Sequence, residues 1–386
     1  MKIISGSIEN VHGIKAYTAT VGLKTSGKKD FAVIYSEKLA NAAAVFTKNK
    51  LKAAPLIVTE NHLKDGKAQA VVINSGIANA GTGKQGITDA EETCLIAAKE
   101  LGINKKHVVV ASTGVIGKAL DMEKIKKGLS LAKSRLKKES ISDGIMTTDT
   151  KKKELAVKIG KITIGAAAKG AGMIHPNMAT MLCFICTDAE IGSGELASML
   201  KSSVDKSFNM ISVDGDTSTN DMAIILANGM AGKISNKEFQ EALDFICIEL
   251  AKKIAADGEG ATKLVEVEVK GAITEEDAKK AAKSIISSNL VKAALFGNDP
   301  NFGRILCAIG NSGASFSEGK IDVYFGDKKI VGSGLKADFN AKEASDAMKK
   351  EKLKILVDLN QGKSKATAWG CDLSYEYVKI NADYHT

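Results

Sequence analysis

One stretch of the sequence places a hydroxyl group where it could act as a nucleophile. Residues 169–182 are Lys-Gly-Ala-Gly-Met-Ile-His-Pro-Asn-Met-Ala-Thr-Met-Leu, a glycine-rich loop with a proline that leads into an apolar run. Thr180 stands at the start of that run, where the loop can leave a cavity, and its β-branch restricts χ1 and so fixes the direction of the hydroxyl. From these residues alone, Thr180 is either a packing residue or a nucleophile.

Other patterns that suggest chemistry fail on inspection. The segment around Gly81 resembles a phosphate-binding loop, but Ala78 and Gln85 stand where a Walker motif needs Gly and Ser or Thr. Cys183 and Cys186 form a CxxC, yet residues three apart on a strand point to opposite faces, so we expect two separate buried thiols. The five histidines lack ligand spacing, so no metal site and no metal cofactor are predicted.

The surrounding pattern indicates the elements that position this loop. Residues 70–74 and 108–111 have the composition of buried strands, and each runs into a polar loop that contains glycine. Apolar residues recur at helical spacing over 122–132, and residues 157–164 alternate around Gly160-Lys161 as in a hairpin. Residues 181–187 are nearly all apolar, which predicts a strand buried on both faces.

A length of 386 residues favours two domains, because single cores stop growing near ~250–300 residues. We place the boundary near residue 275, giving domains 1–274 and 275–386. Thr274-Glu275-Glu276-Asp277 has the form of a helix N-cap ahead of a helix over 281–295. Alternation at 321–325, 353–359 and 373–377 predicts strands, so the second domain is expected to be a small α/β module.

The net charge of +9 raises the question of nucleic-acid binding, but only two of the 54 basic residues are arginine and aromatic residues make up 5%. Base readout and stacking depend on those side chains, so no nucleic-acid partner is expected. Six cysteines are too few for a disulfide framework in a chain of this length. The chain starts without a signal-peptide pattern and has no membrane-length apolar run, which predicts a cytoplasmic protein without membrane contact.

The whole chain resembles one family, the ornithine acetyltransferases, also called bifunctional arginine-biosynthesis or glutamate N-acetyltransferases. Besides residues 169–189, several blocks resemble those of the family in the same order: Ser112–Gly117, Met146–Asp149, Ser212–Asp221, Gly258–Lys263, Asp299–Arg304 and Asn381–Thr386. Three positions depart from the usual family pattern, namely Ile77, Gly81 and Phe302.

This resemblance implies an α/β fold of the α+β kind: a layered α-β-β-α core with a self-cleaving threonine of the N-terminal-nucleophile type, plus a smaller C-terminal α/β domain. It implies a cut between Ala179 and Thr180, giving chains 1–179 and 180–386 that assemble as two copies of each. The cut would free an α-amine on Thr180, with a pKa of about 8, that can serve as the base for its own hydroxyl.

The implied reaction moves acetyl from N-acetylornithine to glutamate through an acetyl-Thr180 intermediate, in a ping-pong cycle that yields ornithine and N-acetylglutamate. No cofactor is implied, and acetyl-CoA stays open as a second donor. Thr113 and Gly114 would stabilise the oxyanion. The family's substrate contacts correspond to Thr147, Lys169, Thr180, Glu259, Asn381 and Thr386. We expect Lys169 to meet a carboxylate and Glu259 to meet the ornithine ammonium.

Two other classes of function stay open at this stage. A self-processing aminopeptidase or deacetylase of related fold would hydrolyse its acyl-enzyme, and a lysine-rich binding protein would never be cleaved. Arg304 lies in a family block, and we expect a structural or intersubunit role for it. Residues 1–179 hold 29 basic and 15 acidic residues, net +14, and the remainder is net −5. This imbalance suggests charge complementarity between the two pieces.

Overall fold

The structure is a computed structural model that describes residues 1–175 and 181–383. Its larger sheet has nine strands, in the order β1-β6-β7-β8-β10-β3-β4-β5, with β2 paired to β3. The bounds of these strands, in chain order, are β1 Lys2–Ile4, β2 Ile14–Ala19, β3 Phe31–Phe46, β4 Lys67–Asn74, β5 Val108–Ser112, β6 Lys153–Ile159, β7 Ile162–Lys169, β8 Leu182–Ala189 and β10 Met222–Gly232.

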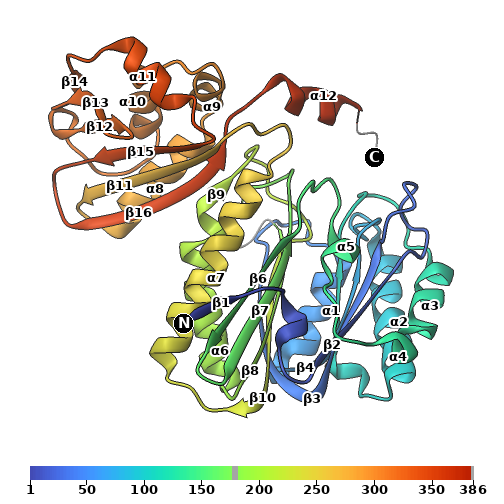
Figure 1. The fold of residues 1–386 in the computed structure, drawn as a ribbon. Helices are drawn as coiled ribbons and strands as arrows, with labels where there is room; N and C mark the ends of the chain where they lie inside the picture. The colour runs from blue at the N-terminus through green and yellow to red at the C-terminus, as the bar shows by residue number, and fades with distance from the viewer. Residues whose placement is uncertain (176–180, 384–386) are drawn as a thin grey trace.

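A second sheet of seven strands, in the order β14-β13-β12-β15-β11-β16-β9, forms the upper part of the molecule in Figure 1. Its strands are β9 Ile211–Ser212, β11 Leu264–Ala272, β12 Asp322–Phe325, β13 Lys328–Gly332, β14 Leu335–Lys336, β15 Lys352–Asp358 and β16 Ser364–Cys371.

Twelve α-helices connect the strands in the described part of the chain. They are α1 Ala54–His62, α2 Gly83–Leu101, α3 Met122–Ser130, α4 Ala132–Arg135, α5 Ser142–Ile145, α6 Ser193–Lys206, α7 Asn236–Ala256, α8 Glu275–Ser287, α9 Asn289–Phe296, α10 Phe302–Gly310, α11 Ala341–Met348 and α12 Tyr375–Asp383.

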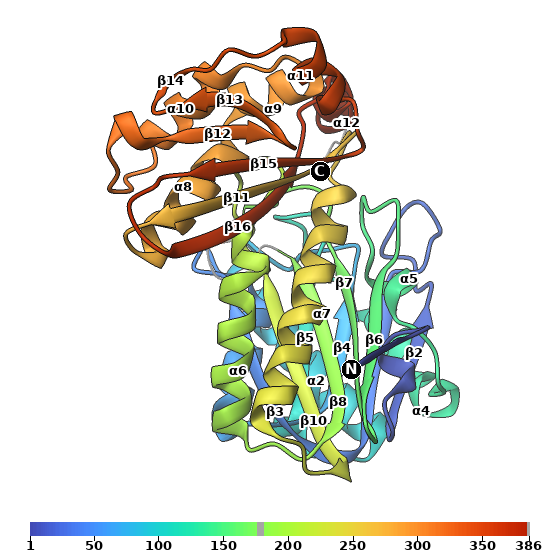
Figure 2. The same ribbon diagram turned by 60° about the vertical axis from the view of Figure 1, so that its left-hand side comes forward.

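The long strand β3 divides the larger sheet into two layers. Its residues 31–35 pair with β2 and β4, whereas residues 41–46 pair with β10. Side chains from both layers, such as Phe184 and Ile73, share one buried core. Helices α6 and α7 cover the outer face of one layer, and α1, α2 and α3 cover the other (Figure 1 and Figure 2). The expected α-β-β-α core is confirmed.

Several local predictions are confirmed. The strands expected at 70–74, 108–111 and 181–187 correspond to β4, β5 and β8, and the hairpin around Gly160-Lys161 is β6–β7. Cys183 and Cys186 are both buried and free, and they lie in different cores on opposite faces of β8. Arg304 Nη1 donates to the Leu290 carbonyl at 2.7 Å, which ties α10 to the start of α9.

Two predictions at the C-terminal end are wrong. The helix expected over 281–295 is two helices, because Ser288 ends α8 and caps α9 by accepting from the Val291 N–H. The strand expected over 373–377 is instead the start of α12. β11 begins at Leu264, which pairs with Cys371, so the chain beyond Cys371 has no neighbouring strand there to extend.

The second sheet takes strands from before the proposed boundary as well as after it. β11 pairs with β15 and β16, and β9 pairs with β16. The chain therefore enters the second sheet briefly at β9, returns to the larger sheet at β10, and joins the second sheet again after α7, at Leu264. A division into independently folding domains at 274/275 stays a prediction.

Candidate active site

The ends of four strands meet at one edge of the larger sheet. Thr113 directly follows β5, Lys169 ends β7, Leu182 begins β8 and Asp221 directly precedes β10. A cavity of about 310 Å³ lies there, with walls from all four positions. Its lining residues are Ala78, Thr113, Gly114, Ile116, Thr147, Thr148, Lys169, Gly170, Gly172, Met173, Ile174, Met181, Leu182, Ser218, Asn220, Asp221, Glu259 and Asn381.

Six of the residues singled out from the sequence line this one cavity. They come from five separate parts of the chain: Thr113, Gly114, Thr147, Lys169, Glu259 and Asn381. Ala179, Thr180 and Thr386 lie outside the described residues. Met181, which follows Thr180 in sequence, is itself a wall of the cavity.

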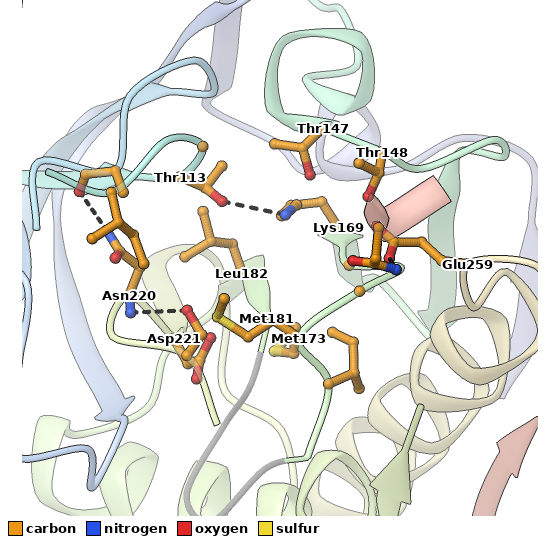
Figure 3. A pocket seen from close by; sticks show the side chains of 18 residues that line it. Thr113, Thr147, Thr148, Lys169, Met173, Met181, Leu182, Asn220, Asp221 and Glu259 are labelled. Carbon is orange, nitrogen blue, oxygen red and sulfur yellow. Dashed lines mark hydrogen bonds between the residues drawn. The ribbon is translucent and has the colours of Figure 1, made fainter. Parts of the chain in front are cut away.

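Thr113 and Gly114 form a turn held against the end of β4. The Thr113 N–H donates to the Asn74 carbonyl at 3.0 Å and is therefore engaged. The Thr113 hydroxyl, by contrast, faces the cavity (Figure 3). Gly114 has φ +124°, and a Cβ there would lie 2.4 Å from the carbonyl carbon of Gly76. The Gly114 N–H makes no hydrogen bond among the described residues. A hydroxyl and a backbone N–H are donors suited to an oxyanion.

Lys169 extends into the cavity between Thr113 and the wall that carries Thr148 and Glu259 (Figure 3). Its Nζ donates to the Thr113 hydroxyl at 3.2 Å. Burial lowers the pKa of Lys169, and the nearby Asp149 carboxylate opposes this effect. Burial would raise the pKa of Asp149, but the ammonium groups of Lys169 and Lys153 lower it to about 2. The charge on Asp149 therefore persists in acid.

Glu259 approaches the cavity from the turn after α7. Its N–H donates to the Ala171 carbonyl at 2.9 Å. A Cβ at Gly172 would lie 2.4 Å from the Glu259 carboxyl carbon, so the carboxylate packs directly on backbone. Asn381 Nδ2 on α12 donates to Glu259 Oε2 at 2.9 Å. Glu259 thus presents a negative charge at the mouth of the cavity.

Sequence reasoning did not single out Asn220 and Asp221, although both belong to a block that it quoted. Asn220 Nδ2 donates to the carbonyls of Ala78 and Ser112, at 2.6 and 2.8 Å, and so joins the loops after β4 and β5. Burial raises the pKa of Asp221 well above its usual range. Its Oδ2 has no hydrogen-bond partner among the described residues. Two adjacent buried polar residues ahead of a strand are the signal that could have found them.

Two of the three departures from the family pattern, Ile77 and Gly81, flank the cavity residue Ala78 in sequence, whereas Phe302 begins α10. Ile77 is 2% exposed and its backbone forms a β-bridge with Val115, while Gly81 has φ +69°. Within residues 1–175 and 181–383, no group of three or more His, Cys, Asp or Glu side chains could hold a metal ion. No helix in that same part of the chain is long and apolar enough to cross a membrane.

Comparison with known proteins gives one consistent result. The ArgJ family model matches residues 15–386. An arginine biosynthesis bifunctional protein ArgJ of Caldanaerobacter subterraneus is 50% identical over 404 residues, covering 100% of each chain. A protein of the same name from Staphylococcus aureus is 50% identical, covering 99% of this chain and 96% of its own.

Among solved structures, a chain of the ArgJ protein of Bacillus halodurans is 44% identical, with a TM-score of 0.51. The match covers 98% of that chain but 52% of this one. The family model and the curated relatives, by contrast, span nearly the whole sequence. The chain that places Thr113, Lys169 and Glu259 around one cavity belongs to the ArgJ family.

Proposed function

We infer that this protein is an acetyltransferase of arginine biosynthesis that moves acetyl from N-acetylornithine to glutamate. Its family and its curated relatives, which are named as bifunctional arginine-biosynthesis proteins, support this reading over hydrolysis. The observation that carries it is the gathering of six predicted residues around the cavity beside Met181. Acetylation of glutamate from acetyl-CoA is the second activity that the bifunctional name of the relatives favours.

The nucleophile in this proposal is Thr180. Its hydroxyl attacks the carbonyl of Ala179, the peptide C–N bond breaks, and the acyl group moves from nitrogen to oxygen. This shift frees the α-amine of Thr180, and water then hydrolyses the ester, which releases the Ala179 carboxylate and regenerates the Thr180 hydroxyl. That amine accepts the proton of the Thr180 hydroxyl when the hydroxyl attacks the acetyl carbonyl of the substrate.

Each attack on an acyl carbonyl creates an oxyanion. In our proposal the Thr113 hydroxyl and the Gly114 N–H donate to it. The hydrogen bond from Lys169 to the Thr113 oxygen supports this role, because it leaves the hydroxyl proton free to point elsewhere. The ornithine carboxylate would meet Lys169 and its terminal ammonium would meet Glu259, with Thr147, Asn381 and Thr386 as further contacts.

Cleavage gives two chains that stay together, 1–179 and 180–386, and we propose that two copies of each assemble. The solved Bacillus halodurans chain supports cleavage, since it corresponds to about half of this sequence. We keep a cytoplasmic location as part of the proposal.

Mass spectrometry of the purified, untagged protein tests the mechanism. For wild type we expect two chains, one that ends at Ala179 and one that begins at Thr180. For Thr180→Ala we expect a single intact chain of 40.6 kDa. A wild-type protein that stays intact after full maturation would overturn the mechanism. Assays with N-acetylornithine and with acetyl-CoA, each with glutamate as acceptor, then separate the two activities.

A further inference from the structure

A chain of three buried charges lies beside the cavity without lining it. Lys153 Nζ lies 2.6 Å from Asp149 Oδ1 and 2.6 Å from Asp257 Oδ2. The side chains of all three residues are at most 4% exposed. Burying such charges is costly unless every polar atom finds a partner. We call Asp149, Lys153 and Asp257 the buried ion chain.

Both carboxylates also accept hydrogen bonds from backbone N–H groups. Asp149 accepts from the N–H groups of Gly170 and Thr147, at 2.7 and 2.9 Å. Asp257 accepts from the N–H groups of Thr150 and Lys151, at 3.0 and 3.2 Å, and from the Thr150 hydroxyl. The buried ion chain is therefore satisfied throughout and holds three backbone segments in one arrangement.

Those segments carry the charged groups of the cavity. Gly170 directly follows Lys169, and Asp257 lies two residues before Glu259. The N–H of Glu259 bonds to Ala171, and its carboxylate packs against Gly172. Lys169 and Glu259 are thus fixed to each other through residues 170–172 on one side and through the buried ion chain on the other. The backbone positions from which these two charged side chains extend therefore have little freedom to move relative to each other.

We propose that the buried ion chain sets the span between the Lys169 ammonium and the Glu259 carboxylate, and thereby selects donors by length. This inference rests on the proposed function, in which these two groups meet the carboxylate and the terminal ammonium of N-acetylornithine. Lys153 and Asp257 act as positioning residues, since neither lines the cavity. A rigid site can discriminate one methylene by about 10–200-fold, whereas a loosened site loses that discrimination.

The test compares N-acetylornithine with N-acetyl-lysine, both acetylated on the α-nitrogen, which differ by one methylene. For wild type we expect kcat/KM to favour N-acetylornithine by about tenfold or more. In Asp257→Asn the amide keeps the shape but loses the charge opposite Lys153. We expect the preference to fall by about tenfold, with a rise in KM for N-acetylornithine larger than the fall in kcat.

A second variant, Lys153→Met/Asp257→Asn, removes the ammonium together with one of its two carboxylate partners. Asp149 then keeps the N–H groups of Thr147 and Gly170 and the nearby Lys169 ammonium. We expect the same loss of preference. The matched control is Asp143→Asn, which breaks the exposed pair of Asp143 with Lys152, the residue next to Lys153. Its preference should equal that of wild type.

Two outcomes would overturn the inference, and a third would overturn the proposed function. In the first, both variants have a lower thermal midpoint but keep the wild-type preference for N-acetylornithine over N-acetyl-lysine. The buried ion chain would then have only a structural role. Failure of both variants to fold or mature would also overturn the inference, since the buried ion chain would then be needed for folding. A wild-type enzyme that takes no acetyl from N-acetylornithine would instead overturn the proposed function.

Discussion

At Lys169, burial and charge act in opposite directions. Burial lowers its pKa, as does the nearby Lys153 ammonium, whereas the carboxylates of Asp149, Asp221 and Glu259 raise it, with burial dominating. The ammonium therefore loses its proton at a lower pH than an exposed lysine does. Since the proposed role of Lys169 is to bind a carboxylate, affinity should fall as the solution becomes alkaline.

We therefore predict that KM for N-acetylornithine increases as the pH is raised. The increase should begin at a pH lower than about 10.4, the usual pKa of a lysine side chain. In Lys169→Arg the guanidinium stays charged, so KM should be nearly constant over the same range, even if its value at neutral pH is higher. The terminal ammonium of the substrate titrates identically in both enzymes. Parallel rises in wild type and Lys169→Arg would exclude Lys169 as the titrating group.

Gly114 combines two constraints that alanine cannot meet. Its φ of +124° disfavours any side chain, and a Cβ would press on the backbone of Gly76. We predict that Gly114→Ala displaces the N–H proposed for the oxyanion and lowers kcat by about 10²–10³. Steady-state kinetics on the matured fraction measures this effect.

Gly117 in the same loop is the matched control for Gly114. It also has positive φ, +79°, but beyond its chain neighbours no atom lies within 4 Å of the position that a Cβ would take. Gly117→Ala should cost some stability and leave kcat within a few-fold of wild type. Equal losses of kcat in the two variants would mean that loop strain, rather than the Gly114 N–H, is responsible.

Among the elements, α12 reaches the cavity through Asn381. None of its described residues is buried, and Figure 1 shows it extending away from the strands of the second sheet. Tyr375 packs edge-on against Phe296 with ring centroids 5.6 Å apart, and Asn381 bonds to Glu259. These contacts, together with the interaction of Tyr377 with Asp214, dock the helix.

We predict that Tyr375→Ala raises KM for N-acetylornithine up to about fivefold, because an aromatic pair is worth roughly 1 kcal/mol. The thermal midpoint should hardly change, since Tyr375 is 85% exposed. Val378→Ala, at another exposed position on α12, serves as the control and should leave KM unchanged. A KM for Tyr375→Ala equal to that of wild type would show that docking of α12 does not depend on the ring.

The elements that were predictable are those whose local pattern agrees with their final surroundings. The β6–β7 hairpin alternates around a Gly-Lys turn, and β8 is apolar throughout because both of its faces are buried. The prediction for the start of α12 failed because its local pattern does not agree with its final surroundings. Leu373, Tyr375 and Tyr377 alternate like a strand, but Asp372 accepts from the N–H groups of Thr262 and Lys263 and turns the chain away from β11.

At the scale of the whole molecule, the proposed cut falls between two adjacent strands of one sheet. β7 precedes it and β8 follows it, and the two are paired over six residues. β10, also after the cut, pairs with β3 from before it. Separating the pieces would break two strand ladders and expose the shared cores. We therefore expect opposite net charges to contribute less to their association than this interleaving does.

We predict that the matured pieces elute together at both low salt and 1 M NaCl in size-exclusion chromatography. At 1 M the Debye length is about 3 Å, so long-range attraction between the +14 and −5 pieces is screened. Denaturant, which unfolds the sheet, should be needed to separate them. Elution as two peaks in high salt alone would assign their association to charge.

The sequence by itself determined several strands and, through family resemblance, the α-β-β-α class and six of the residues around the cavity. These features follow from short-range periodicity or from contiguous motifs. Only the tertiary structure decided which sheet β11 joins, and it alone revealed Asn220, Asp221 and the buried ion chain. Asp149 and Asp257 are 108 positions apart and meet through Lys153. Pairings of that kind depend on how distant segments pack, which no local pattern records.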